Sequence, residues 1–168
     1  MRMTELFLAE LDRELDRNNR ALQQVPEGKY DWKPHEKSMQ FGHLAQLVAT
    51  MPSWLTMMID QDQLDIAPKD GPTYKPEALR TSAELLVGAE KAVAAARAAL
   101  GKTTDEHLMT PWRLLAGGNV VMELPRHVMM RDALNHLAHH RGQMTVYLRL
   151  MGSNVPALYG PSADDKRF

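Results

Sequence analysis

The sequence predicts an all-α protein in which four amphipathic helices form a bundle, with a short β-hairpin before the fourth helix. Three observations indicate this class. Apolar residues recur every three or four positions in four long segments. Proline and glycine separate these segments, and 44% of the residues are hydrophobic, which is enough for a core. The length of 168 residues suits one domain, 1–168, and no repeat is visible.

The first helix is predicted from Thr4 to about Gln24, with Pro26 and Gly28 ending it. One face is a largely apolar stripe with a single polar member: Leu6, Phe7, Leu11, Leu15, Asn18 and Leu22. The opposite, charged face is expected to be mostly solvated: Glu10, Asp12, Arg13, Glu14, Asp16, Arg17 and Arg20. In the following connector, Tyr30 and Trp32 are expected to anchor the chain to the bundle, or alternatively to line a pocket.

The second helix is predicted from Ser38, as its cap, to about Asp60, and Pro52 predicts a kink or break within it. The connector 61–75 is long and polar, which favours a crossover over a tight turn between helices two and three. The third helix is expected to run from Pro76 to Leu100 and to end at Gly101.

Residues 111–123 are expected to form the hairpin, because two apolar runs flank Gly117-Gly118-Asn119. Pro125 suits the first turn of the fourth helix, which should extend to about Met151. The tail, 153–168, is expected to fold back over the bundle without regular structure.

Composition limits the possible functions. The formal net charge of −1 gives no basic excess for nucleic-acid binding. With no cysteine in the chain, any metal must be bound by nitrogen and oxygen ligands. Neither a signal peptide nor a run of about 18 apolar residues is visible. We therefore expect a soluble, cytoplasmic protein that binds neither nucleic acid nor membrane.

The strongest chemical signal is in the fourth helix, where three of the seven histidines fall within five residues. His136 and His140 are four residues apart, so they share a helix face and can bind one metal ion together. No glutamate follows His136, so the HExxH protease chemistry is not implied. Two ordinary helical histidines are the alternative interpretation. His139, about 60° to one side of His136, replaces His140 if the register differs.

A third imidazole is available on the second helix. His43 lies on a stripe with Leu47, Thr50 and Trp54, and this largely apolar stripe predicts that His43 faces inward. An inward histidine is either a ligand or a hydrogen-bonded core residue. Three neutral imidazoles would bind Zn²⁺, Ni²⁺ or a similar ion and leave coordination positions open. His35, His107 and His127 are not expected to be ligands.

Three further residues are candidates near this site, and no catalytic residue is identified. Asp132, one turn before His136, is a candidate to orient a ligand histidine through the free ring nitrogen of that histidine, unless it is a plain surface carboxylate. Gln143 and Tyr147 share the face of the proposed ligands and are candidates for substrate contact. Core packing is the alternative for both.

Two segments carry a resemblance to a known family: Phe41-Gly42-His43-Leu44-Ala45 and Asn135-His136-Leu137-Ala138-His139-His140-Arg141-Gly142-Gln143. On these segments the chain resembles the DinB/YfiT-like family of small metal-binding four-helix bundles. Four weaker matches extend the resemblance over nearly the whole chain: 30–34, 111–112, 145–150 and 155–160.

The resemblance implies an up-down-down-up bundle, a homodimer and one divalent metal ion held by His43, His136 and His140. It also implies that the metal activates a low-molecular-weight thiol, since some similar proteins use bacillithiol, mycothiol or glutathione as a cosubstrate. The first hypothesis is therefore a metal-dependent thiol S-transferase or related hydrolase that acts on a small molecule. The second is a non-catalytic, metal-stabilised, dimeric stress or binding protein.

Overall fold

The computed structural model describes residues 1–69 and 77–167 and is mostly helical, with a small sheet. Six helices lie in the described residues: α1 (Met3–Leu22), α2 (Phe41–Thr50), α3 (Ser53–Asp60), α4 (Ser82–Lys102), α5 (Asp105–Leu108) and α6 (Arg126–Leu150). Three strands form one sheet: β1 (Gln63–Asp65), β2 (Pro111–Ala116) and β3 (Asn119–Pro125). None of the helices in these ranges combines the length and apolarity needed to cross a membrane.

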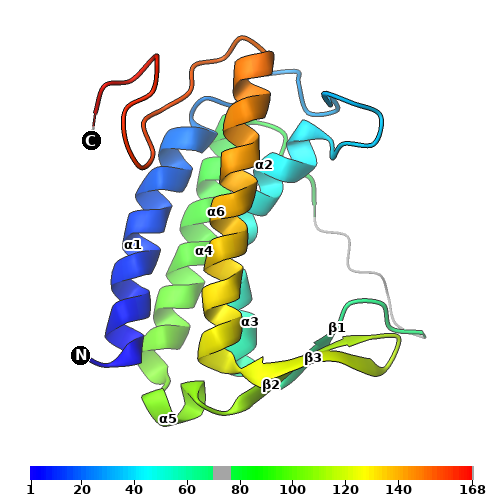
Figure 1. The fold of residues 1–168 in the computed structure, drawn as a ribbon, viewed down its shortest axis with the longest axis vertical. Helices are drawn as coiled ribbons and strands as arrows, with labels where there is room; N and C mark the ends of the chain where they lie inside the picture. The colour runs from blue at the N-terminus through cyan, green and yellow to red at the C-terminus, as the bar shows by residue number, and fades with distance from the viewer. Residues whose placement is uncertain (70–76, 168) are drawn as a thin grey trace.

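The long helices α1, α4 and α6 lie side by side (Figure 1). The shorter helices α2 and α3 follow one another along these long helices. Both α4 and α6 contact α1, α2 and α3. Two clusters of buried apolar side chains fill the space between the helices. One cluster lies near the sheet and includes Leu55, Trp112 and Met130. The other lies near the opposite end and includes Phe41 and Leu148.

The break predicted at Pro52 is confirmed. The helix α2 ends at Thr50, and α3 begins at Ser53. Proline has no N–H to donate to the preceding turn, so the regular helix is interrupted at this point. The hydroxyl of Ser53 donates to the carbonyl of Thr50 across the break, at 2.8 Å. The interruption divides the predicted second helix into two segments that both contact α6.

Several helix ends differ from the prediction. The predicted cap Ser38 is wrong, because α2 begins only at Phe41. The predicted first residue of the third helix, Pro76, lies outside the described residues, and α4 begins at Ser82. Its cap is Thr81, whose hydroxyl accepts from the Glu84 N–H while the Glu84 carboxylate accepts from the Thr81 N–H. Gly101 does not end α4, which continues to Lys102.

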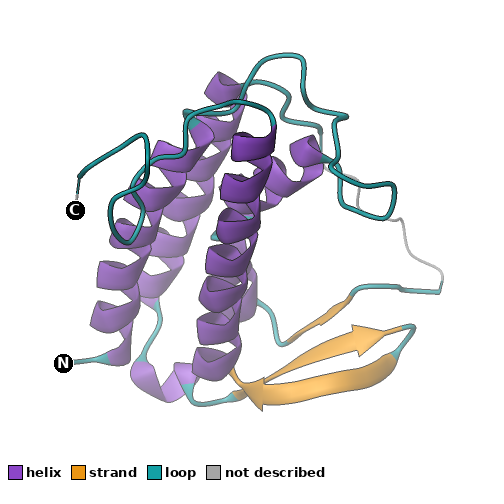
Figure 2. Cartoon of the chain, turned by 45° about the horizontal axis from the view of Figure 1, so that its top comes forward, coloured by secondary structure: helices purple, strands orange, loops and turns teal. Residues whose placement is uncertain are grey.

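The sheet projects outward from one end of the group of helices (Figure 2). In it, β2 and β3 pair antiparallel around Gly117 and Gly118, whose φ angles of 60° and 82° suit glycine. The strand β1, which was not predicted, pairs in parallel with β2. The carboxylate of Asp65, at the end of β1, accepts from the N–H groups of both turn glycines, at 3.1 and 2.7 Å. The prediction of an all-α protein with a short hairpin therefore lacked β1 and the three-stranded sheet that this strand completes.

A buried ionic network joins α1 to α6 and corrects the assignment of Glu14 to the solvated face. Glu14 is only 4% exposed, and Arg141 of α6 is fully buried. The Arg141 guanidinium lies 2.6 Å from the Glu14 carboxylate and donates to Asn18 at 2.7 Å. It also donates to the Tyr159 hydroxyl at 2.5 Å. The C-terminal tail therefore folds over the helices without regular structure, as predicted.

Candidate metal centre

His136 and His140 lie together on the side of α6 that contacts α3. Their ring centroids are 4.4 Å apart. The Trp54 ring of α3 lies 5.7 Å from the His136 ring in an edge-to-face arrangement. His136 is exposed, whereas His140 is only 8% exposed. The predicted pairing of these two imidazoles on one face is confirmed, and one of the two rings contacts an aromatic side chain of α3.

Gln143 forms a hydrogen bond with the His140 ring. The His140 Nδ1 lies 2.8 Å from the Gln143 side-chain oxygen. In the tautomer with the proton on Nδ1, this bond leaves the Nε2 lone pair for a metal ion. Metal-binding histidines commonly have this arrangement, because a hydrogen bond to one ring nitrogen orients the other toward the metal. Gln143 therefore contacts a proposed ligand in addition to its predicted role in substrate contact.

The environment of His136 favours its neutral form. Partial desolvation of the ring lowers the pKa of the His136 imidazole although the residue is exposed overall, and the nearby rings of His140 and His139 lower this pKa further. Only an unprotonated ring nitrogen can bind a metal ion. The lowered pKa of His136 therefore favours the form in which a ring nitrogen of this residue has a lone pair available.

His43 is not buried, which contradicts the predicted inward orientation. The buried side of α2 consists instead of residues such as Leu44, Ala45 and Val48, and His43 lies on the exposed side. Residues 43, 47 and 50 share a face of α2, but the break at Pro52 ends this regular spacing before Trp54. The sequence pattern therefore does not place His43 beside the tryptophan that contacts His136.

The donor set suits a divalent ion such as Zn²⁺ or Ni²⁺, which imidazole nitrogens bind well. The paired rings and the free Nε2 of His140 meet this chemistry. Within residues 1–69 and 77–167, no three histidine or carboxylate side chains are grouped closely enough to hold a metal ion. The three-histidine site thus stays a prediction, because His43 does not form such a group with His136 and His140.

The remaining candidates differ in their surroundings. The exposed His139 ring lies 5.4 Å from the His140 ring, so it stays an alternative ligand. Asp132 is exposed, and in the described part of the chain no hydrogen bond joins it to His136. Tyr147 packs edge-to-face on Trp32 at 5.7 Å, and its hydroxyl donates to the Met39 carbonyl at 3.3 Å. The predicted roles of Asp132 and Tyr147 stay predictions.

The other three histidines bond to the backbone. His107 Nε2 lies 2.9 Å from the Ile59 carbonyl, and His127 Nδ1 lies 3.1 Å from the Leu108 carbonyl. His35 Nδ1 accepts from the N–H of Lys37 at 3.1 Å.

Sequence reasoning did not single out Trp54 and Arg141 as functional or structural partners. Trp54 lies on the predicted stripe of His43, and this position is the feature of the sequence that could have indicated its place near the proposed site. Arg141 falls between the apolar positions Leu137, Met144 and Leu148 of the helix, so its burial follows from the same periodicity. A charged residue at such a position requires a buried partner, and Glu14 provides it.

Comparison with solved structures defines the class to which this fold corresponds. Solved structures of two DinB-like proteins share the fold. One, from Bacillus cereus ATCC 10987, is 23% identical, with a TM-score of 0.69 over 92% of this chain and 97% of the other. The second, YjoA from Bacillus subtilis, is 20% identical, with a TM-score of 0.65 over 95% of this chain and 98% of the other.

The sequence match assigns the family. The model of the DinB family matches residues 1–167, so the chain belongs to the DinB family. The uncharacterized protein YrdA of Bacillus subtilis (strain 168) is 40% identical over 43 residues. That match spans only about a quarter of each protein, 26% of this chain and 26% of YrdA.

Proposed function

We propose that this protein is a divalent-metal-dependent enzyme, a thiol S-transferase or related hydrolase. The observation that carries the proposal is the His136–His140 pair, with ring centroids 4.4 Å apart and the His140 Nδ1 hydrogen-bonded to Gln143. Membership of the DinB family supports it. In the proposed site, His43 supplies the third nitrogen. The helices α1, α2–α3, α4 and α6 form the up-down-down-up bundle that holds these residues.

The bound ion would supply Lewis acidity, which lowers the pKa of a coordinated thiol or water so that thiolate or hydroxide is available near neutral pH. The protein's own residues perform the remaining tasks. His136 and His140 present neutral imidazoles, and Gln143 holds the His140 ring in one orientation through its Nδ1–H. Trp54, against His136, gives one wall of the site an aromatic face on which an apolar part of a small substrate can pack.

The proposal is tested with protein loaded with Zn²⁺ or Ni²⁺ and offered a panel of low-molecular-weight thiols, each with an electrophile. We expect metal-dependent consumption of one thiol, measured with a thiol-specific reagent, and loss of this activity in His136→Ala. A matched variant, His35→Ala, removes a histidine of the connector and should leave the activity unchanged. A second assay tests for a hydrolase: the electrophile is offered without a thiol, and its hydrolysis by water is measured as release of acid.

Inactivity in both assays, in protein shown to hold its metal ion, would contradict the enzyme proposal. In that case the metal ion would have a structural role, as in a metal-stabilised dimeric binding protein. A homodimer is part of both proposals, and sedimentation of the metal-loaded protein measures it.

A further inference from the structure

A second candidate site lies on the other side of α6 from the histidine pair. It is a groove of about 470 Å³ between α1 and α6, within the size range of small-molecule sites. The residues that α6 contributes to it include Asn135 and Ala138 but none of the histidines. Counting 100° per residue, Ala138 lies about 160° around the helix from both His136 and His140. The groove is therefore separated from the histidine pair by the width of the helix.

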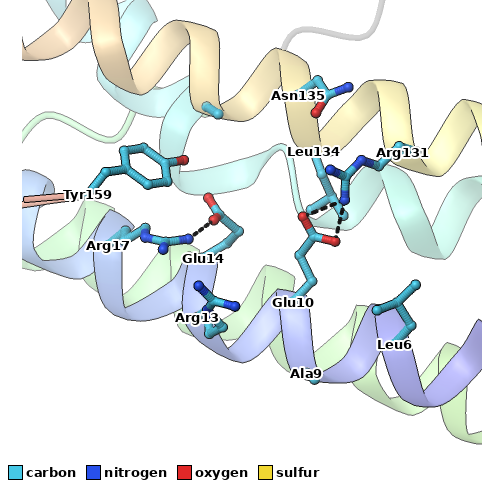
Figure 3. Close-up of a pocket in the computed structure, with 11 residues that line it drawn as sticks. Leu6, Ala9, Glu10, Arg13, Glu14, Arg17, Arg131, Leu134, Asn135 and Tyr159 are labelled. Carbon is cyan, nitrogen blue, oxygen red and sulfur yellow. Dashed lines mark hydrogen bonds and ion pairs between the residues drawn. The ribbon is translucent and has the colours of Figure 1, made fainter. Parts of the chain in front are cut away.

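The groove has an apolar wall and charged ends (Figure 3). Ala9, Leu134 and Ala138 form part of the wall. At one end, Arg131 of α6 donates to both carboxylate oxygens of Glu10, at 2.7 and 2.6 Å. At the other end, Arg17 pairs with Glu14. Both glutamates of the groove are thus already neutralised by arginines.

Arg13 differs from the other arginines of the groove. It is exposed and rises from α1 beside Glu10 and Glu14 (Figure 3). In residues 1–69 and 77–167, no hydrogen bond or ion pair occupies its guanidinium, whereas Arg17 and Arg131 each have a carboxylate partner. Its planar fork of N–H donors matches the geometry of a carboxylate or phosphate group.

The balance of charge also favours an anion. Three arginines and two glutamates line the groove. A fourth arginine, the fully buried Arg141, lies behind Glu14 and adds a further positive charge beneath the floor. The Tyr159 ring lies at the end of the groove where Arg17 pairs with Glu14, and the Arg17 guanidinium is 4.2 Å from the centroid of this ring. An oxyanion near Arg13 would thus meet a net positive field and an adjacent apolar wall.

We propose that the groove between α1 and α6 binds a small organic oxyanion, which has a carboxylate or phosphate head and a compact apolar body. Arg13 binds the head, and the apolar body packs against Ala9, Leu134 and Ala138. This site does not depend on the histidine pair or on a metal ion.

The test is a titration of the ¹⁵N-labelled full chain with hexanoate, hexyl phosphate and hexanamide, followed by amide chemical shifts. We expect one or both anions to shift the amides of Ala9, Asn135 and Ala138, and the uncharged hexanamide to have no effect. Arg13→Gln should weaken anion binding about tenfold, the lower end for a lost charge-assisted hydrogen bond. Lys91→Gln, a matched charge change on the exposed side of α4, should leave it unchanged.

A second variant tests the apolar wall. Ala138→Leu fills the groove without changing its charge, so it should abolish the shifts. Protein treated with a chelator should bind the anions as well as untreated protein. Equal shifts with hexanamide, or unchanged affinity in both Arg13→Gln and Ala138→Leu, would overturn the proposal. Neither result bears on the histidine site.

Discussion

Gln143 is the residue that most directly controls the proposed metal ligand His140. Its side-chain oxygen lies 2.8 Å from Nδ1 and favours the tautomer with the proton on this nitrogen. We expect Gln143→Leu to lower the affinity for Zn²⁺ about 10- to 100-fold, the usual effect of removing a partner that orients a metal-binding histidine. Competition with a chromophoric chelator measures this affinity. Gln143 is exposed, so the free energy of unfolding of the metal-free protein should barely change.

Gln143→Glu is the control for this prediction, because it keeps an acceptor for the Nδ1 proton. It should retain most of the affinity. Equal Zn²⁺ affinity in Gln143→Leu and in the wild type would show that the amide does not orient the ring.

Gly42 precedes His43 and allows the connector to approach the helix. A Cβ at this position would lie 2.1 Å from the Tyr30 ring. The Tyr30 carbonyl also accepts from the Gly42 N–H at 2.8 Å, so the two residues cannot easily separate. We expect Gly42→Ala to reduce the free energy of unfolding by about 1–3 kcal/mol, the usual cost of overpacking. Urea denaturation monitored by circular dichroism measures this change.

Gly101 is the matched control, since nothing lies within 4 Å of a Cβ placed there and the residue is inside α4. Gly101→Ala should therefore raise the free energy of unfolding by about 0.5–1 kcal/mol. Similar effects of the two substitutions would contradict the packing of Tyr30 on Gly42.

The helices could be predicted well from the sequence, because their signal is local. The predicted first and fourth helices differ from α1 and α6 by only one or two residues at each end. The start of α4 was placed too early because Thr81-Ser82-Ala83-Glu84, its capping box, was not used. The strand β1 was missed because three residues carry no periodicity, and its pairing partner Arg113 is 50 residues away from Gln63.

The candidate site was predicted in part for the same reason. His136 and His140 share one helix, so their spacing alone places them together. The exposure of His43 depends on which side of α2 packs inward, and both sides of this short helix carry apolar residues. The groove between α1 and α6 joins residues as distant as Arg13 and Tyr159, and no local pattern brings these together.

The projecting sheet is held by Asp65, and this contact makes it sensitive to acid. The backbone N–H groups of Ala67, Gly118 and Gly117 donate to the carboxylate and lower the pKa of Asp65 from its usual 3.8. A carboxyl group whose pKa is lowered on folding adds stability above its usual pKa, and this stability is lost as the pH falls through the lower value of the folded state. Loosening of the turn is therefore expected below pH 3.8.

Amide hydrogen exchange at Gly117 and Gly118 measures this effect. Exchange, corrected for its intrinsic pH dependence, should accelerate in the wild type as the pH falls below 3.8. In Asp65→Asn it should be fast already at neutral pH and should change little with acid. Protection of both glycines in Asp65→Asn at neutral pH would contradict the role of this carboxylate.

Across the whole molecule, the buried network around Arg141 joins α1, α6 and the C-terminal tail. Replacing Arg141 with methionine leaves the Glu14 carboxylate, 4% exposed, with one arginine partner fewer, and Asn18 without its donor. We expect Arg141→Met to reduce the free energy of unfolding by about 3–5 kcal/mol, as measured by urea denaturation. Arg97→Met, which removes a half-exposed pair with Asp12, should cost at most about 1 kcal/mol.

The double variant Glu14→Leu/Arg141→Met separates the network from simple packing. Replacing both charges with apolar groups should restore much of the stability lost in Arg141→Met. If the double variant is less stable than Arg141→Met, the network contributes more to stability than the pairing of a buried charge.

The metal content of the purified protein tests the central claim most directly. Protein prepared without chelators should contain about one divalent ion per chain by elemental analysis. Three imidazole ligands are enough to hold one such ion, and they leave its other coordination positions open. His136→Ala and His140→Ala should each abolish the bound metal, and His43→Ala should weaken it strongly. His35→Ala, outside the site, should leave it unchanged. A metal content that is the same in the wild type and in both α6 variants would contradict the three-histidine site.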